Sequence, residues 1–371
     1  MKMVYVSFRG HFSDSPRAIY EALQDRGFEA DVTWLSAPQT AAGFPADIAH
    51  VPFGSRESIA ALEEADVVVS NDHIPLDWAK RPGTIYLQTW HGTPLKRIHN
   101  DVRWAPEGRL AYLKHDIARW DLLLSPNPAS TPRLRKAFGY RGPIHETGLP
   151  RNDRLSDPHR DEIRAAVRAD LGIDAGQTAV LYTPTWRDDL VFLRTGPQDF
   201  EFPLDLADFG GRLGDSHVLL LRLHNMVTDR LEIAEGTAVR DVCNHPDIRD
   251  LYLAADLLVT DYSSTMFDFA ITGKPLLFYT YDLEDYRDRL RGFYFDLEDV
   301  APGPLAHTSA DLVSAIADLD AVRERYAEKY ADFRRTFCAL EDGAATDRVL
   351  DLLFPGGARA AGLAATTTGR N

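Results

Sequence analysis

Residues 256–275 read DLLVTDYSSTMFDFAITGKP, where a short apolar run leads through a polar turn into a helical pattern. The β-rich residues 256–260 predict a strand, and the small hydroxyl residues Ser263 and Ser264 predict the start of a helix. Gly273 and Pro275 mark the end of that helix. A strand, a turn and a helix in this order indicate a βαβ unit, so the segment predicts a parallel α/β sheet.

The same alternation runs along most of the chain and begins twice. Strands are predicted at residues 4–8, 31–35, 66–70, 84–88 and 121–125, and again at 179–183, 218–223, 256–260 and 275–279. A length of 371 residues also favours two domains over one. The sequence therefore predicts two doubly wound, Rossmann-like α/β domains.

The residues between the two sets of strands indicate where the domains divide. Residues 148–153 (GLPRND) are turn-forming and helix-breaking, so we expect the hinge there and the boundary near Leu155. The two domains are then expected at 1–155 and 156–354. Residues 355–371 are rich in Ala, Thr and Gly and lack anchoring apolar residues, and we expect them to form a disordered tail.

The composition excludes several classes of protein. A formal net charge of −15 argues against broad binding of nucleic acid, because phosphate backbones favour basic surfaces. The two cysteines, Cys243 and Cys338, are too few for a disulfide framework or a zinc cluster, and they fit a reducing cytoplasm. The apolar runs are far shorter than the roughly 20 residues of a membrane span, and the first residues lack the pattern of a signal peptide. We expect a soluble, cytoplasmic protein.

The segment 88–96 (QTWHGTPLK) follows a predicted strand, and parallel α/β sheets bind ligands at the carboxyl ends of their strands. His91 is a candidate general base there. Gly92 would let the backbone approach a ligand, Thr93 offers a hydroxyl, and Lys96 offers positive charge near a phosphate. The alternative is a histidine that only satisfies a loop carbonyl.

Arg222 and His224 lie at the end of the strand predicted at 218–223 in the second domain. Alternation along a strand puts these two side chains on the same side, where a cation and an imidazole can meet one anionic group. A buried or loop-capping histidine is the alternative here.

The helix start after residues 256–260 is a candidate site for a diphosphate. Asp261 precedes Ser263, Ser264 and Thr265, whose backbone N–H groups would lie at the positive end of the helix dipole. Asp268, further along the helix, could accept hydrogen bonds from a ribose or a polyol. Hydroxyl residues at a helix start are usually caps, and one geometry can serve both purposes.

Two arginines, Arg187 and Arg291, are candidate phosphate clamps. Surface ion pairs with neighbouring aspartates are the alternative for both. Asp188 and Asp189 are neighbouring carboxylates without further spaced ligands, so no metal site is predicted.

Residues 133–141 (RLRKAFGYR) interleave cations with apolar groups. A helix lying on anionic lipid has this pattern, and Phe138 and Tyr140 would then meet lipid headgroups together with the cations. A solvated helix face is the alternative.

Taken together, these segments resemble the CDP-glycerol glycerophosphotransferase family, the teichoic-acid primases and polymerases. The matching phrases occur in the family's order and span most of the chain: residues 88–94 (QTWHGTP), 148–153 (GLPRND), 183–188 (TPTWRD), 222–224 (RLH), 260–264 (TDYSS) and 291–296 (RGFYFD). Ser15 stands where Asn is usual, and Asn225 where Pro often follows, which affects the expected loop shape.

The resemblance implies a glycosyltransferase-B-like architecture, in which the second domain holds a CDP-activated polyol donor and the acceptor enters from the first. It also implies that His91 and His224 are the catalytic histidines, and that Ser263 and Ser264 are the family's seryl pair. An acceptor hydroxyl, assisted by His91, would displace CMP from the glycerol-bearing phosphorus. No redox cofactor is implied.

The acceptor implied by the resemblance is a lipid-linked or oligomeric polyol phosphate of the teichoic-acid or capsular type. The enzyme would then work peripherally at the inner face of the cell membrane. Ribitol phosphate or another polyol phosphate could replace glycerol phosphate. A sugar-nucleotide glycosyltransferase or epimerase of the same architecture, and a non-enzymatic nucleotide-binding scaffold, are the other readings that the sequence leaves open.

Overall fold

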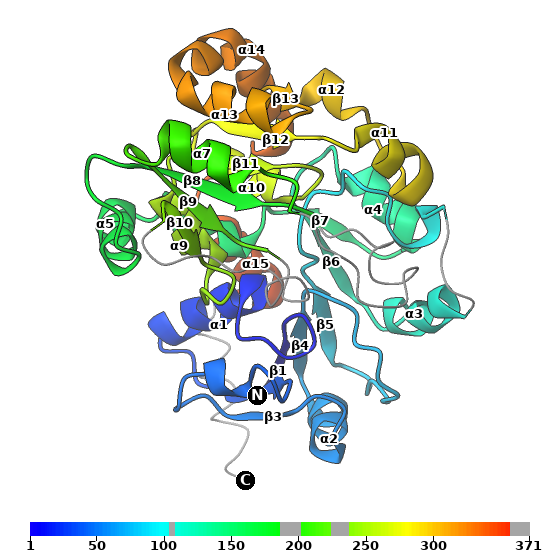
Figure 1. The fold of residues 1–371 in the computed structure, drawn as a ribbon. Helices are drawn as coiled ribbons and strands as arrows, with labels where there is room; N and C mark the ends of the chain where they lie inside the picture. The colour runs from blue at the N-terminus through cyan, green and yellow to red at the C-terminus, as the bar shows by residue number, and fades with distance from the viewer. Residues whose placement is uncertain (104–107, 186–201, 224–236, 357–371) are drawn as a thin grey trace, which may run out of the picture.

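The structure is a computed structural model, and it describes residues 1–103, 108–185, 202–223 and 237–356. The described residues form two parallel sheets, one in each half of the molecule (Figure 1). The first sheet has the order β3-β2-β1-β4-β5-β6-β7 and the second the order β10-β9-β8-β11-β12-β13. In both sheets the chain starts at a central strand, winds to one edge and then to the other, which is a doubly wound topology.

The strands of the first sheet are β1 Lys2–Val6, β2 Asp31–Ser36, β3 His50–Pro52, β4 Val67–Ser70, β5 Ile85–Gln88, β6 Leu122–Ser125 and β7 Ile144–Glu146. Those of the second are β8 Thr178–Thr183, β9 His217–Leu221, β10 Val239–Asp241, β11 Leu257–Thr260, β12 Leu276–Tyr279 and β13 Leu305–Ala306. All nine predicted strands are present, with ends that differ by one or two residues. The predicted α/β fold class and its glycosyltransferase-B-like arrangement of two domains are confirmed.

The α-helices of the first half are α1 Asp14–Asp25, α2 Arg56–Glu64, α3 Arg109–Ile117 and α4 Thr131–Phe138. Those that follow are α5 Arg160–Asp170, α7 Leu206–Leu213, α9 Ile248–Ala254, α10 Thr265–Ala270, α11 Leu283–Asp285, α12 Leu297–Val300, α13 Ser309–Ala317, α14 Leu319–Phe337 and α15 Ala345–Leu353. Shorter helical turns are η1 Ala41–Gly43, η2 His99–Asp101, η3 Pro150–Ser156 and the π-helical η4 Tyr286–Arg291.

The first sheet is covered on both faces, as parallel sheets usually are. Successive residues of β1 point to opposite faces, so Met3 and Tyr5 pack in one core and Val4 and Val6 in the other. Burial on both faces explains why the strands of this sheet, such as β4, are continuous apolar runs.

The last helix, α15, follows the second domain in the sequence but packs in the first. Its residues Val349, Leu350 and Leu353 belong to the core that contains Met3, and the ring of Phe354 lies 4.8 Å from that of Phe28. The chain therefore crosses between the domains twice, once at η3 and once between α14 and α15. The range 156–354 predicted for the second domain includes this returning helix.

The basic segment 133–141 lies on α4 and the turn after it. Phe138 is 2% exposed and Tyr140 is 5% exposed, and both pack in the core of the first domain. The expectation that these aromatic rings meet lipid headgroups is therefore wrong. They are buried because Leu134, Ala137 and Phe138 follow helical spacing and form the inward face of α4. None of the helices in the described residues is long and apolar enough to cross a membrane.

Candidate active site

His91 follows β5 in a turn fixed by buried polar groups. The side-chain oxygen of Gln88 accepts a hydrogen bond of 2.9 Å from the backbone N–H of Trp90, whose φ of 54° is left-handed and unusual for a bulky residue. The Nδ1 atom of His91 lies 2.6 Å from the backbone oxygen of Asn71. Since a carbonyl oxygen only accepts, Nδ1 carries the hydrogen, and the neutral ring keeps a free lone pair on Nε2.

Burial of His91 favours the neutral ring. Burial lowers the pKa of His91 below its ordinary value, and the carboxylates of Asp72 and Asp14 only partly offset this effect. A neutral imidazole with its lone pair on Nε2 can accept a proton at neutral pH. The geometry is therefore that of a general base, as predicted for this residue.

Gly92 brings the His91 turn against the second domain. Its φ is +149°, and a Cβ atom at this position would lie 3.1 Å from Oγ and 3.2 Å from Cβ of Ser264. A side chain here would require Ser264 to shift by a few tenths of an ångström and would also strain the backbone at this positive φ. The structure thus brings together the histidine turn of the first domain and the seryl turn of the second, which the sequence predicted only as separate elements.

Thr93 and Lys96 have structural contacts in the loop that follows. Thr93 is 2% exposed, and its hydroxyl accepts a hydrogen bond of 2.8 Å from the side-chain amide of Asn127. Lys96 forms an antiparallel backbone bridge with Phe293, so the loop after His91 lies beside residues 291–296. Thr93, predicted as a supporting residue that offers a hydroxyl, therefore uses this hydroxyl within the protein, where it supports the loop.

The turn after β11 is fixed mainly by Asp261, which is buried. Its Oδ1 atom accepts hydrogen bonds from the backbone N–H of Thr185 at 2.8 Å and from that of Tyr262. Asp261 therefore connects the turns that follow β8 and β11, which are neighbouring strands. Asp261 therefore stabilises the turns that form the predicted donor site, and its bonded oxygen faces the protein backbone.

Ser263, Ser264 and Thr265 surround the start of α10 and are half-buried. The hydroxyl of Thr265 lies 2.9 Å from that of Thr183, and Ser263 Oγ accepts a weak hydrogen bond of 3.4 Å from the N–H of Thr265. Ser264 is the N-cap residue but makes no side-chain capping bond to its helix. The seryl pair is thus not fully occupied with capping.

Asp268 forms a buried ion pair between the domains. Its Oδ2 atom lies 2.7 Å from Nη2 of Arg151, and its Oδ1 atom accepts a hydrogen bond of 3.1 Å from Asn152. Both carboxylate oxygens are bonded within the protein. A direct hydrogen bond to a ribose or polyol, as predicted for Asp268, would require these partners to be displaced.

Arg151 connects the two domains to the histidine turn. Its Nη1 atom lies 2.7 Å from Oδ2 of Asp14 and donates a hydrogen bond of 3.0 Å to the backbone oxygen of His91. Arg151 lies in the GLPRND phrase of residues 148–153, but the sequence predicts no role for it. A cation in the segment between two predicted domains was the signal that could have found it.

Burial and neighbouring charges shift the pKa values of Arg151, Asp14 and Asp268 in different directions. Burial opposes the charge of Arg151, but Asp14 and Asp268 raise its pKa above the ordinary value. Burial also opposes the charge of Asp14, yet Arg151 and hydrogen bonds lower the pKa of this carboxyl. Burial dominates at Asp268, whose pKa is raised. Arg151 therefore holds two carboxylates, and the ionised state of Asp14 is the better supported.

Arg222 supports a loop of the second domain. Its Nη1 atom donates hydrogen bonds to the backbone oxygens of Val242 at 2.9 Å and His245 at 2.8 Å. Burial lowers the pKa of Arg222. His224 and Arg187, and the side chain of Arg291, lie outside the described residues, so their predicted roles stay predictions.

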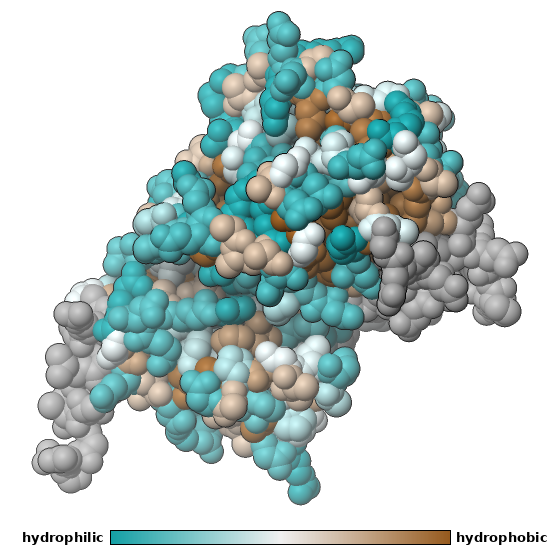
Figure 2. All heavy atoms as spheres, turned by 60° about the vertical axis from the view of Figure 1, so that its left-hand side comes forward, coloured by the Kyte–Doolittle hydropathy of each residue, from teal (hydrophilic) through white to brown (hydrophobic). Residues whose placement is uncertain are grey.

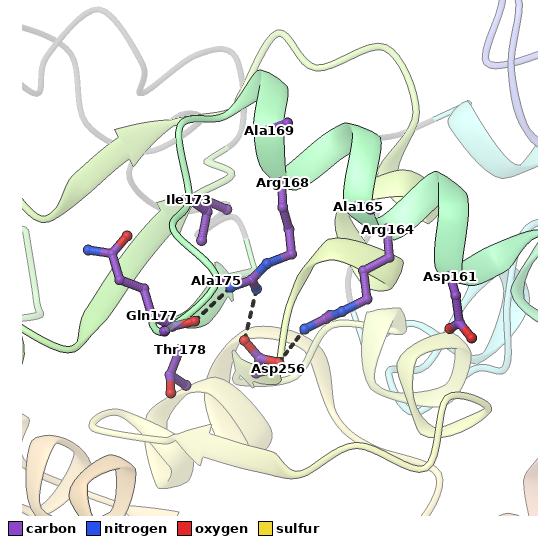
Figure 3. Close-up of a pocket in the computed structure, with 11 residues that line it drawn as sticks. Asp161, Arg164, Ala165, Arg168, Ala169, Ile173, Ala175, Gln177, Thr178 and Asp256 are labelled. Carbon is purple, nitrogen blue, oxygen red and sulfur yellow. Dashed lines mark hydrogen bonds and ion pairs between the residues drawn. The ribbon is translucent and has the colours of Figure 1, made fainter.

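A pocket of about 600 Å³ lies beside α5 and the start of β8 (Figure 3). Arg164 and Arg168 point toward Asp256 and pair with it at 2.6 and 3.0 Å. The same guanidinium groups donate to backbone oxygens at the end of α9, and so does Lys274. These cations cap a helix. The pocket lies at the amino ends of β8 and β11, the edge of the second sheet opposite to the turn that holds Ser263 and Ser264.

The described residues contain no group of three or more His, Cys, Asp or Glu side chains arranged to hold a metal ion. Cys243 and Cys338 are buried thiols in the part of the chain that the structure describes.

The known proteins that this chain resembles include two whose names place them in the synthesis of teichoic acid. The chain is 39% identical over 361 residues to a teichoic acid glycerol-phosphate transferase of Staphylococcus aureus, covering 94% of this chain and 92% of the relative. It is 37% identical over 365 residues to a teichoic acid poly(glycerol phosphate) polymerase of Bacillus subtilis. This match covers 95% of this chain but only 48% of that protein. The chain thus spans about half the length of this second relative.

The fold is similar to that of a wall teichoic acid polymerase, TagF, in a variant soaked with CDPG. The TM-score is 0.86 at 36% identity, with 95% of this chain and 88% of that chain covered. A protein-family model described as CDP-glycerol:poly(glycerophosphate) glycerophosphotransferase matches residues 1–355. The chain belongs to this CDP-glycerol glycerophosphotransferase family.

Proposed function

We propose that the protein transfers glycerol phosphate from CDP-glycerol to a hydroxyl of a lipid-linked, teichoic-acid-like acceptor and releases CMP. The observation that carries this proposal is that the turn holding the neutral His91 lies, through its neighbour Gly92, directly against Ser264. The Nδ1 atom of His91 is committed to Asn71, and Gly92 lies against Ser264. A base from the first domain and a candidate phosphate site from the second therefore meet at one point.

The proposed reaction is a single in-line displacement. The acceptor hydroxyl gives its proton to Nε2 of His91 while its oxygen forms a bond to the glycerol-bearing phosphorus. The bond between this phosphorus and the bridging oxygen breaks, and the electron pair leaves with CMP. Positioning and electrostatic stabilisation supply most of the catalysis in phosphoryl transfer, so the rigid support of the histidine turn is central. The step needs no redox cofactor.

The donor is proposed to bind along the second domain. Ser263 and Ser264 would contact the diphosphate, because they are half-buried and the hydroxyl of Ser264 makes no capping bond. Asp261 would keep this turn in shape. His224, Arg187 and Arg291 remain candidates for neutralising the phosphates.

A donor panel tests the function. The protein is incubated with CDP-glycerol, CDP-ribitol or UDP-sugars, each with a lipid-linked polyol phosphate acceptor, and the release of CMP, UMP or UDP is measured. We expect acceptor-dependent release of CMP from CDP-glycerol. Faster release from CDP-ribitol would change the proposed donor, and release from UDP-sugars alone would contradict the proposal.

The place of action is proposed to be the inner face of the cell membrane. On the face shown in Figure 2, hydrophilic residues predominate and hydrophobic ones lie in several separate areas. In the segment 133–141 the exposed cations are Arg135, Lys136 and Arg141, while Arg133 packs 4.6 Å above the ring of Phe295. Contact with anionic lipid would therefore be electrostatic, at about 1 kcal/mol per cation and weakened by salt.

Liposome sedimentation tests this contact. Substituting Arg135, Lys136 and Arg141 by Gln should reduce binding to anionic liposomes at low salt. A matched control replaces three exposed cations of α14, Arg323, Arg325 and Lys329, by Gln, since the change in net charge is the same. Equal loss in both variants would indicate only a general effect of charge, and no binding by the parent would contradict the membrane contact.

A further inference from the structure

Phe8 is an exposed aromatic residue beside the candidate base. In the described part of the chain its side chain is among the few large apolar ones that are exposed, at 41%, a value that Tyr281 shares. The ring of Phe8 lies 5.3 Å from the imidazole of His91, measured between centroids, at an angle of 58°. The loop after β1 therefore presents an apolar surface next to the atom that is proposed to accept the proton.

The backbone holds this ring in an unfavourable conformation. Phe8 has a φ of +44° and Arg9 a φ of +61°, two successive left-handed residues that are not glycine. The turn is closed by hydrogen bonds from the N–H of Gly10 and of His11 to the oxygen of Ser7. The ring of Phe8 lies beside the rings of His11 and His91 but stays 41% exposed, so packing within the protein accounts for only part of this strain. Strained backbone of this kind clusters at binding and catalytic sites.

One residue fixes both Phe8 and His91. The side-chain oxygen of Asn71 accepts a hydrogen bond of 2.9 Å from the N–H of Phe8, and its backbone oxygen accepts the bond from His91. Asn71 is fully buried, and its amide donates to the hydroxyl of Ser7 at 3.2 Å. The ring and the imidazole are therefore held in a fixed relation, as a binding surface and a base acting on one substrate would need to be.

We propose that Phe8 binds the acceptor: its ring packs on the C–H groups of the terminal polyol unit and directs the hydroxyl of that unit toward His91. This inference rests on the proposed function. A polyol is polar at its hydroxyls and apolar along its carbon chain, so a flat aromatic face can contact the carbons while the hydroxyls remain free to react. Phe8 belongs to the first domain, across from the turn proposed for the donor phosphates. A cytosine base stacked on Phe8 is the outcome that would contradict the assignment.

Phe8→Gly is the most informative variant, because glycine suits a φ of +44° while it removes the ring. The melting temperature should be equal to or higher than that of the parent. The KM for the acceptor should rise about tenfold, equivalent to about 1.4 kcal/mol. The kcat should fall as well, because the hydroxyl is no longer directed toward His91, while the KM for CDP-glycerol stays nearly unchanged. Phe8→Tyr should keep the parent's acceptor KM. Tyr281→Ala removes an equally exposed ring from the second domain and should not alter the acceptor KM.

Calorimetry separates this inference from the proposed function. A short, lipid-free oligo(glycerol phosphate) is titrated into the parent and into Phe8→Gly without any donor, and weaker binding by the variant is expected. A parent that binds the oligomer but transfers nothing would contradict the function, and the calorimetric comparison would still decide the role of Phe8. Equal affinity of the two proteins, no binding by the parent, or a rise in the KM for CDP-glycerol alone would overturn the inference.

Discussion

Replacing Arg151 by Met should destabilise the protein strongly. The Arg151 side chain is 8% exposed, and its partners Asp14 and Asp268 are 8% and 9% exposed. Without the guanidinium group, two carboxylates would remain buried with no cation. Removing one partner of a buried ion pair costs about 3–5 kcal/mol. We expect a loss within this range at neutral pH, because a single residue serves both pairs.

The cost should come from the unpaired carboxylates more than from the lost cation. Adding Asp14→Asn and Asp268→Asn to Arg151→Met removes both charges, so the triple variant should regain a large part of the lost stability. Arg151→Lys should fall between the parent and Arg151→Met, since an ammonium group cannot hold two carboxylates in the forked geometry of a guanidinium group.

Urea unfolding, followed by tryptophan fluorescence and by circular dichroism, measures these differences. The two signals must change together for a single free energy of unfolding to be assigned in a two-domain protein. A loss below about 1 kcal/mol in Arg151→Met, as for solvent-exposed pairs, would refute the reasoning. So would a triple variant that is no more stable than the single one.

Four further predictions concern the site and the hinge. His91→Ala should leave donor binding nearly intact and slow transfer by roughly 10²–10⁴. In the parent, the acidic limb of the kcat/KM profile should lie below the ordinary histidine pKa of 6.5, because burial lowers the pKa of His91; a limb above that value would contradict the assigned base. Replacing Ser263 and Ser264 together by Ala should weaken the binding of CDP-glycerol in calorimetry without abolishing it, and unchanged affinity would move the diphosphate elsewhere. Burial raises the pKa of Glu341 from 4.5 to about 8, so the folded state binds a proton more tightly and stability falls as pH rises through this window. Glu341→Gln should remove this fall in stability with pH. The urea midpoints of the variant and the parent should then differ near about pH 8 and agree near about pH 4. An equal fall in stability with pH in both proteins would contradict this role of Glu341.

The central strands were predictable and the edge strands were not. The four strands that sequence reasoning missed, β3, β7, β10 and β13, form the outer edges of the two sheets. Each has two or three residues and is only partly buried, so none produces an apolar run. The central strands are buried on both faces, and their continuous apolar runs are therefore visible in the sequence.

The site was predictable where it depends on strand ends. His91 and Ser264 follow the carboxyl ends of β5 and β11, so each could be expected at the ligand-binding edge of its own sheet. The role of Arg151 could not, because its partners Asp14 and Asp268 lie 137 and 117 positions away in the sequence. Spacing along a chain gives no information on an ion pair formed between domains. The burial of Phe138, in contrast, was already readable from its helical spacing to Leu134.

The return of α15 to the first domain has a consequence for how the protein is made. Asp153 accepts hydrogen bonds from the N–H groups of Ala345 and Thr346, and Val349 and Leu353 then complete a core that begins at Met3. During synthesis the first domain emerges early but lacks one of its own helices until residues 345–354 have left the ribosome. Its core is therefore finished only after the second domain has been translated, and the native first domain depends on a length of chain that lies beyond its neighbour.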